Sequence, residues 1–290
     1  MKLTLIEVPY HYGFQQPHFG AGRGPGLYRE AGAEKALERA GFDVTAETVE
    51  RSRTVEDIPA AVAEGNRLLA TQVSRALDSG AFPLVLGGGC NACLGILAGL
   101  KRRVGVVWFD AHGDFNTPET TPSGFFDGMP LAVAAGLGYR DLWREITDIP
   151  PVPGSEILLV GARDLDPGEL DNIQKAGVGL VTATEIKSRG VATALGPKLP
   201  PLRAQVTDLY LHFDIDVLDP TLAPGVDFRA PGGLSLEEAE EAIRLLAAQF
   251  HIRAAALTAY NPDREEDERT LKAGLRILNT LAAAARGARP

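Results

Sequence analysis

Short apolar runs alternate along this chain with longer stretches in which apolar residues recur at helical spacing. The runs are rich in β-branched and large apolar residues and therefore predict strands. They cover residues 3–8, 82–87, 104–110, 156–162, 177–183, 209–216 and 252–260. Several are apolar on both faces, which is typical of strands buried between two layers of helices.

Three stretches outside these runs predict helices. Residues 56–80 have helical periodicity and end in glycine, a common residue just after a helix. Residues 235–250 open with Ser235 and carry Glu238 three residues later, the pattern of a capping box. Residues 269–287 predict a last helix that packs against the sheet.

Strand and helix patterns alternate over the whole length, which predicts an α/β fold. We expect a single three-layer domain over residues 1–290, with a mostly parallel central sheet flanked by helices. The sequence contains no serine- or glycine-rich linker and no internal repeat, so neither feature indicates a second domain. Because ligands of open parallel sheets bind beyond the carboxyl ends of the strands, candidate chemistry is expected there.

Composition narrows the class of protein. Hydrophobic residues make up 45% and charged residues 23% of the 290 residues, as in ordinary globular proteins. The net charge of -9 disfavours a nucleic-acid partner. No apolar run approaches the ~20 residues of a membrane span, and the first residues lack the features of a signal peptide. We therefore expect a cytoplasmic protein without membrane or nucleic-acid partners.

Two predicted strands end in closely spaced acidic and histidine residues. These are Asp110, His112, Asp114, His212, Asp214 and Asp216. Alternate residues of an extended chain point to the same side, so the carboxylates of each motif would face one crevice. Because like charges repel strongly at low dielectric, one or two divalent cations would stabilise this arrangement. Oxygen-rich sites with an imidazole suit metals such as Mn²⁺. Either motif alone could instead be a solvated loop start or a helix cap.

The order of motifs resembles the ureohydrolase superfamily, which contains arginases, agmatinases and formiminoglutamases. Residues 109–124 look like the second signature block of that family, and residues 212–225 with 232–234 look like the third. Residues 22–32, 86–95 and 259–265 stand where the N-terminal, first and last blocks are expected.

This resemblance implies an arginase-like α/β domain that hydrolyses a guanidinium-type C–N bond with hydroxide generated at one or two Mn²⁺ ions. Zn²⁺, Fe²⁺ and Ni²⁺ are the alternative metals. Asp110 and Asp214 match the bridging ligands, and His112 and Asp216 match the other ligands of one metal. Asp114 matches a ligand of the second metal, a residue that in the family also handles the proton given to the leaving amine. Relatives are commonly trimers or hexamers, so a homo-oligomer is also implied.

Cys90 stands where the family has a histidine ligand, and it forms a Cys-x-x-Cys pair with Cys93. Cys90 could bind a metal, although sulfur favours Zn²⁺ or Fe over Mn²⁺. It could be inert beside a weakened or empty first metal site, or form a redox pair with Cys93. Alternatively another group supplies the missing ligand. His212 is the candidate for that role, unless it orients a metal-bound carboxylate instead.

Three substrate positions also depart from the family. Phe125 replaces the asparagine that contacts the substrate α-carboxylate in arginases, and Ala259 replaces the glutamate that pairs with the guanidinium. A guanidinium without this partner loses a charge-assisted pair, so arginine is not the expected substrate. Asp127 replaces a loop histidine and is a candidate for cation recognition or acid–base catalysis. Its alternative role is to cap a helix starting near Gly128.

The resemblance, together with these departures, implies a metal-dependent hydrolase acting on a small guanidino, amidine or amide-like substrate. The alternative is a catalytically impaired relative that binds a metal or ligand. The candidate catalytic residues are Asp114, Asp127 and His212. The candidate metal ligands are Cys90, Asp110, His112, Asp114, Asp214 and Asp216. We further expect Trp108 in the core and both His11 and His18 as exposed loop residues.

Overall fold

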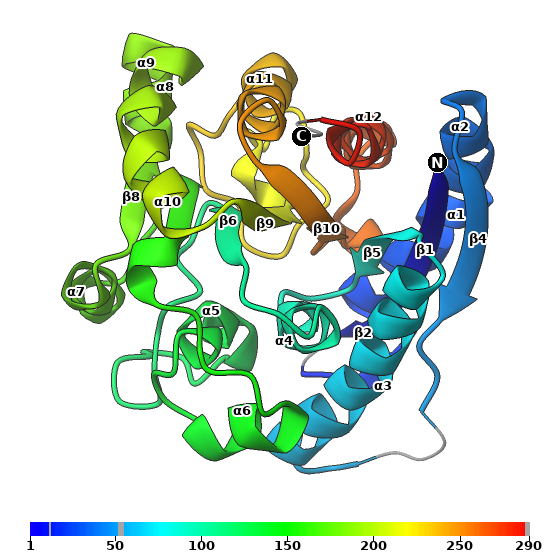
Figure 1. The fold of residues 1–290 in the computed structure, drawn as a ribbon, viewed down its shortest axis with the longest axis horizontal. Helices are drawn as coiled ribbons and strands as arrows, with labels where there is room; N and C mark the ends of the chain where they lie inside the picture. Colours follow the sequence, from blue (N-terminus) through cyan, green and yellow to red (C-terminus); the bar gives the residue numbers. More distant parts are fainter. Residues whose placement is uncertain (12, 52–54, 288–290) are drawn as a thin grey trace.

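The computed structural model describes residues 1–11, 13–51 and 55–287. Its centre is an eight-stranded sheet in the order β4-β1-β5-β10-β9-β6-β7-β8, with every neighbouring pair parallel (Figure 1). The strands are β1 Lys2–Val8, β4 Asp43–Thr48, β5 Phe82–Gly87, β6 Gly105–Phe109, β7 Ile157–Ala162, β8 Gly179–Thr182, β9 Asp208–Asp214 and β10 His251–Thr258. A short antiparallel pair joins β2 Tyr10–His11 to β3 Gln16–Pro17.

Helices connect the strands and cover the sheet. They are α1 Gly24–Glu30, α2 Ala33–Arg39, α3 Ile58–Asp78, α4 Ala92–Gly99, α5 Pro130–Ala134, α6 Arg140–Ile146, α7 Pro167–Ala176, α8 Ala183–Arg189, α9 Val191–Leu195, α10 Leu199–Gln205, α11 Leu236–Ala247 and α12 Arg269–Ala284. Among the described residues, no helix is both long and apolar enough to cross a membrane.

Alternating side chains of the central strands enter two separate apolar cores. Leu211 and Phe213 of β9 pack on the face covered by α1, α2 and α8–α12, whereas Tyr210 faces α3–α7. Figure 1 shows the sheet between these two groups of helices. The three-layer α/β domain predicted from the sequence is confirmed.

Most elements lie where the apolar pattern predicts them. Each run predicted to be a strand overlaps one, and the three predicted helices correspond to α3, α11 and α12. The capping box of α11 is present, since Ser235 Oγ accepts from Glu238 N at 3.1 Å and Ser235 N donates to Glu238 Oε2 at 2.8 Å. Strand β4 was missed, because it pairs only with β1 at the sheet edge and its side chains are mostly half-buried.

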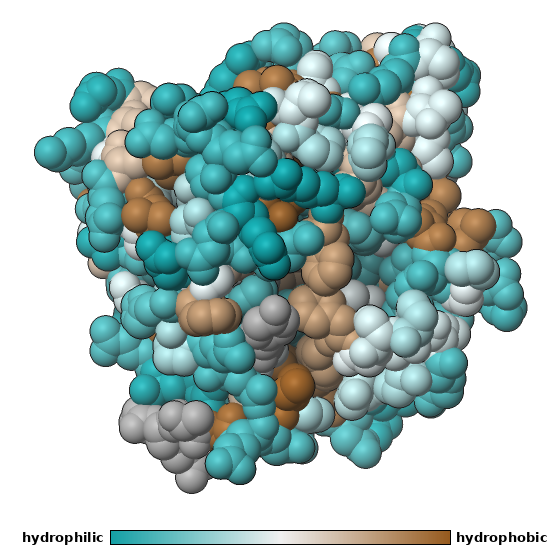
Figure 2. Space-filling model, turned by 180° about the vertical axis from the view of Figure 1, so that it is seen from behind, coloured by the Kyte–Doolittle hydropathy of each residue, from teal (hydrophilic) through white to brown (hydrophobic). Residues whose placement is uncertain are grey.

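Strand register brings distant segments to one edge of the sheet. Phe109 of β6 pairs with Phe213 of β9, and Thr258 of β10 pairs with both Asp214 and Gly87. The residues that follow these four neighbouring strands therefore emerge together at their carboxyl ends. On the face of the molecule seen in Figure 2, the surface is largely hydrophilic and its hydrophobic side chains form small separate groups.

Candidate metal centre

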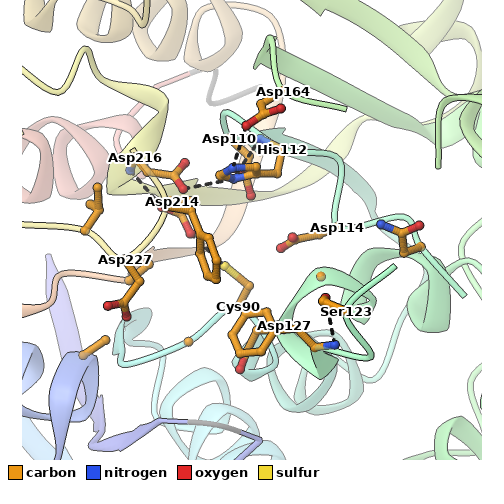
Figure 3. Close-up of a pocket in the computed structure, with 18 of the residues that line it drawn as sticks. Cys90, Asp110, His112, Asp114, Ser123, Asp127, Asp164, Asp214, Asp216 and Asp227 are labelled. Carbon is orange, nitrogen blue, oxygen red and sulfur yellow. Dashed lines mark hydrogen bonds and ion pairs between the residues drawn. The ribbon is translucent and has the colours of Figure 1, made fainter. Parts of the chain in front are cut away.

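A cavity of about 480 Å³ lies beyond the carboxyl ends of the central strands. Its walls include residues that follow β5, β6, β9 and β10, and many of them are acidic (Figure 3). The cavity contains all six residues that the sequence suggested as metal ligands: Cys90, Asp110, His112, Asp114, Asp214 and Asp216.

Five of the six form two compact groups that share Asp110. One group is Cys90, Asp110 and Asp214, and the other is Asp110, His112 and Asp216. In each group the potential ligand atoms lie within 4.8 Å of one another. In the second group, His112 Nδ1 lies 3.3 Å from Asp110 Oδ1 and 3.1 Å from Asp216 Oδ2. Sulfur, imidazole and carboxylate donors at such spacing fit divalent metal ions.

Local backbone turns fix the carboxylates in place. Asp110 Oδ1 accepts from His112 N at 2.7 Å, and Asp214 Oδ1 accepts from Asp216 N at 2.8 Å. Both contacts use the amide two residues on, the pattern of an Asx turn. Asp216 Oδ1 in turn accepts from Ala111 N at 3.1 Å, which links the turn after β9 to the turn after β6.

The carboxylates of this cluster are poorly compensated. Burial, together with Asp216, raises the pKa of Asp110 to about 6. Burial also raises the pKa of Asp214 well above its usual value, with Asp216 and Asp110 adding to the effect. Burial alone would raise the pKa of Asp216, but the neighbouring His112 holds it below its usual value. One imidazole cannot neutralise three carboxylates, so a bound cation would stabilise the ionised cluster.

Asp114 lies close to the two groups but belongs to neither. Its backbone has a φ of 47°, and its carbonyl accepts from Leu131 N and Ala132 N. The side chain points towards the space between the other acidic residues (Figure 3), and its buried Oδ2 has no hydrogen-bond partner among the described residues. Burial and the nearby Asp110 raise its pKa well above the usual value. This oxygen fits either a metal ligand or a proton carrier.

Cys90 is buried against the acidic cluster as a neutral thiol. Its Sγ donates to Asp214 Oδ2 at 3.0 Å and lies 3.5 Å from Thr258 Oγ1. Burial raises its pKa well above the usual value, and Asp214, Asp114 and Asp110 raise it further. Cys93 is also buried, and neither cysteine is in a disulfide. Cys90 therefore lies where a metal ligand is expected, but only a nearby cation would favour its thiolate form.

The sequence interpretation of His212 as a catalytic residue or missing ligand is not supported, because the ring does not line the cavity. It is fully buried and stacks on Trp108, with ring centroids 3.5 Å apart. Its Nδ1 lies 2.8 Å from Tyr210 Oη and its Nε2 lies 3.2 Å from Thr258 Oγ1. Burial lowers its pKa well below the usual value, so the ring is neutral. His212 instead holds Thr258 beside Cys90.

Asp127 lines the cavity, but its oxygens hold the loop before α4. Oδ1 accepts from the backbone amide of Asn91 at 3.3 Å and from its side-chain amide, and Oδ2 accepts from Gly13 N at 3.4 Å. A Cβ at Gly89 would lie only 2.6 Å from Asp127 Oδ1, so a larger residue at this position would displace the Asp127 carboxylate. The prediction that Asp127 caps a helix near Gly128 is wrong, since its partners come from other segments.

Several lining residues were not predicted from the sequence. His11 was expected to be exposed, but it is buried and its Nε2 lies 3.3 Å from Asp227 Oδ2. His18 is exposed as expected. Glu169 of α7 accepts from Phe115 N at 2.9 Å, and burial raises its pKa to about 7. His11 ends the two-residue strand β2 and Glu169 lies in the first turn of α7, and neither has a local pattern that distinguishes it from a surface residue.

Arg163, just after β7, holds the turn that carries Asp216. Its guanidinium donates to the carbonyls of Asp216 at 2.7 Å, Val217 at 3.1 Å and Leu218 at 3.2 Å. It also donates to Ala230 O at 2.8 Å. Burial lowers the pKa of Arg163 from its usual value, although nearby Asp216 and Asp110 oppose the change. One side chain thus joins the turn that carries Asp216 to the loop that follows it.

Comparisons with known proteins agree with this architecture. A profile of the Arginase family matches residues 1–283. The arginase of Bacillus caldovelox is 34% identical over 96% of this chain and 97% of its own. The crystal structure of arginase from Bacillus subtilis has a TM-score of 0.88 at 33% identity, covering 97% of this chain and 98% of that one. A formimidoylglutamase structure from Bacillus subtilis has a TM-score of 0.77 at 22% identity, and the match covers 98% of this chain and 86% of that one. This similarity supports the fold.

The electrostatics predict an effect of Asp214→Asn on the metal-free protein. Because the folded-state pKa of Asp214 is raised, its carboxyl group favours folding at low pH and loses this contribution as pH rises through that pKa. In chelator, we expect the variant to be more stable than the parent by about 1–3 kcal/mol near pH 7, with the gain shrinking towards pH 4. Urea denaturation at both pH values measures this difference.

The exposed Asp171→Asn on α7 is the matched control and should change stability by less than about 0.5 kcal/mol. Added Mn²⁺ should stabilise the parent more than Asp214→Asn. A variant that is less stable than the parent at both pH values in chelator would contradict the proposed repulsion.

Arg163→Gln should weaken metal binding by about tenfold or more, because the carbonyls around Asp216 lose their shared donor. Arg163→Lys should fall in between, since an ammonium keeps the charge but not the fork of donors. Calorimetric titration with Mn²⁺ measures the affinity. Arg144→Gln, on the surface of α6, is the control and should bind like the parent. If Arg163→Gln bound Mn²⁺ with unchanged affinity, the turn around Asp216 would hold its shape without Arg163.

Proposed function

The chain belongs to the arginase family, and from this premise we propose that it is a metal-dependent hydrolase cleaving a C–N bond of a small guanidino, amidine or amide-like substrate. The observation that carries the proposal is the pair of ligand groups sharing Asp110 inside one cavity. A buried cluster of this composition is unfavourable without a cation, which supports a metal-binding role over a purely structural one.

The residues present would hold up to two divalent ions. Asp110, His112 and Asp216 would bind one of them, and Cys90, Asp110 and Asp214 would bind the other. We propose Mn²⁺ for the oxygen-rich group, whereas the thiol makes Zn²⁺ or Fe²⁺ a suitable alternative beside Cys90, and Ni²⁺ is a further possibility. When bound, such ions lower the pKa of a water molecule and supply a nucleophile at neutral pH.

A side chain of the protein would donate the proton that the leaving nitrogen needs. The buried Oδ2 of Asp114 has no hydrogen-bond partner among the described residues, and burial with the nearby Asp110 raises the pKa of this carboxyl group well above its usual value. Asp114 is therefore the proposed donor to the leaving nitrogen. Asp127 has three hydrogen-bond donors on its oxygens, which favours a role in holding the loop before α4 over direct acid–base catalysis.

We further propose that arginine is not the preferred substrate. Ala259 lines the cavity without a carboxylate that could pair with a guanidinium, and Phe125 offers no polar group to an α-carboxylate. The similar proteins of Bacillus are named arginases, so arginine is nevertheless the first compound to test. Family membership is also the support for a cytoplasmic location and for a trimer or hexamer, and both remain predictions.

Cys90 and Ala259 also favour a second candidate function, a relative that binds a metal or ligand but is impaired in catalysis. Both substitutions remove groups on which the family depends. The two functions differ in turnover, so one experiment separates them.

We expect the purified protein, reconstituted separately with Mn²⁺, Zn²⁺, Fe²⁺, Co²⁺ or Ni²⁺, to release urea or ammonia from at least one guanidine or amidine. The panel should include arginine, agmatine, simple alkylguanidines and benzamidine. Asp114→Asn should lower kcat by about a hundredfold or more because the proton donor is lost. Absence of turnover with every metal, in protein that still binds the metal, would favour the impaired relative.

Cys90 is tested as a ligand by substituting cobalt. If Cys90 coordinates, the Co²⁺-loaded protein should show a thiolate-to-cobalt charge-transfer band in the near ultraviolet that Cys90→Ser abolishes. Cys93→Ser is the matched control and should keep the band, because Cys93 is not in either ligand group. If Cys90 does not coordinate and the first site is weak or empty, Cys90→His should instead raise the number of bound metal ions. A band that survives in Cys90→Ser would exclude coordination by Cys90.

A further inference from the structure

The cavity lining has two chemically different parts. Its acidic floor at the strand ends carries the carboxylates of the candidate metal centre, and Phe125 and Phe228 also line the cavity. Their ring centroids are 5.4 Å apart at an angle of 52°. Phe228 also approaches His112 edge-on, with ring centroids 6.1 Å apart, so the aromatic pair lies next to the acidic floor. The two rings come from different loops, one before α5 and one before α11.

Phe228 is unusually exposed for its size. Its exposed fraction is 54%, and the other large apolar residues with comparable exposure among the described parts of the chain are Met1, Phe19 and Leu68. Of these four, Phe228 alone lines the cavity. Leaving a phenyl ring in water forgoes the favourable burial of its apolar surface. An exposed ring at a cavity is thus a candidate contact for an apolar ligand group.

The charge of the cavity determines how a ligand with one cationic end and one apolar end would be oriented. Besides the metal cluster, Asp164, Asp166, Glu169 and Asp227 line the cavity. Arg229 also lines it, but its guanidinium donates to Pro224 O, Arg264 O and Glu266 Oε1. These four carboxylates lie outside the two ligand groups, so they would still attract a cationic group when metal ions are bound, which leaves the aromatic pair to contact the other end of the molecule.

We propose that Phe125 and Phe228 form an aromatic clasp that selects substrates in which a guanidinium or amidinium group carries an apolar, preferably aromatic, tail. The inference rests on the proposed function and specifies its substrate class. A charged tail such as that of arginine would lose its hydration against two phenyl rings without gaining a polar partner from them. An aryl or alkyl tail would instead bury the exposed face of Phe228.

The test compares two guanidines that differ in the tail, benzylguanidine and agmatine, by calorimetric titration of the Mn²⁺-loaded protein. We expect benzylguanidine to bind more tightly. Phe228→Ser should raise its Kd by about tenfold, which corresponds to ~1.4 kcal/mol for loss of one aromatic contact, and should change the Kd of agmatine by less than about twofold. Phe228→Tyr keeps the ring and should retain the preference.

Phe19→Ser is the matched control, since Phe19 is 56% exposed but lies outside the cavity. It should change neither Kd. The clasp is refuted if wild-type protein does not bind benzylguanidine, if Phe228→Ser leaves its affinity unchanged, or if both probes weaken equally. A larger loss for agmatine would mean that the rings contact the cation instead, and it would also refute the proposal.

Binding and hydrolysis are measured separately, so failure of the clasp is distinguishable from failure of the proposed function. Tail-dependent binding without release of urea or ammonia supports the clasp and argues against a hydrolase. Hydrolysis of both probes with the same KM in Phe228→Ser and wild type supports the hydrolase and refutes the clasp.

Discussion

Mutual repulsion among buried carboxylates is the constraint on which the centre of this molecule depends. The register of β6 and β9 places Phe109 opposite Phe213, so Asp110 and Asp214 must leave the sheet side by side. Backbone amides, His112 and Arg163 then hold the acidic turns in place without cancelling their charge. The fold thus maintains an unfavourable charge distribution that a cation would relieve.

The layer beneath the carboxylates shows how this arrangement is supported. Trp108 donates through Nε1 to Asp110 Oδ2 at 2.9 Å and stacks on His212. His212 contacts Thr258, whose hydroxyl lies 3.5 Å from the sulfur of Cys90. Three neighbouring strands therefore contribute to one polar network under the cavity floor. Because every member is buried, a change at one of them is transmitted to the acidic side chains above.

The sequence predicted those features that depend on local pattern. Apolar runs located the central strands, and closely spaced Asp residues at two strand ends located the acidic cluster. Edge strand β4 was missed because pairing with β1, more than burial, defines it. For His212, alternation alone was misleading. It lies on the same side as Asp214 but two residues earlier in the strand, stacked beside Trp108, where the strand is still buried.

Contacts between distant segments could not be read from local pattern. Asp127 bonds to Gly13, 114 residues away, and His11 is buried by pairing with Asp227. The aromatic pair is a similar case, since neither Phe125 nor Phe228 belongs to a run that predicts a site. Resemblance to a family identified Phe125 and Asp127 as departures from the usual residues, but only the packed loops show which neighbours these residues have.

The shared position of Asp110 has a consequence for how a pair of ions would load. Because this carboxylate belongs to both ligand groups, binding of one ion to it would change its affinity for the other ion. Occupancy at either subsite must therefore change affinity at its neighbour, and thermodynamics requires the influence to be equal in both directions. Uptake of two ions by this chain would then be cooperative or anticooperative, and a half-loaded molecule would be a distinct species rather than an average of empty and full ones.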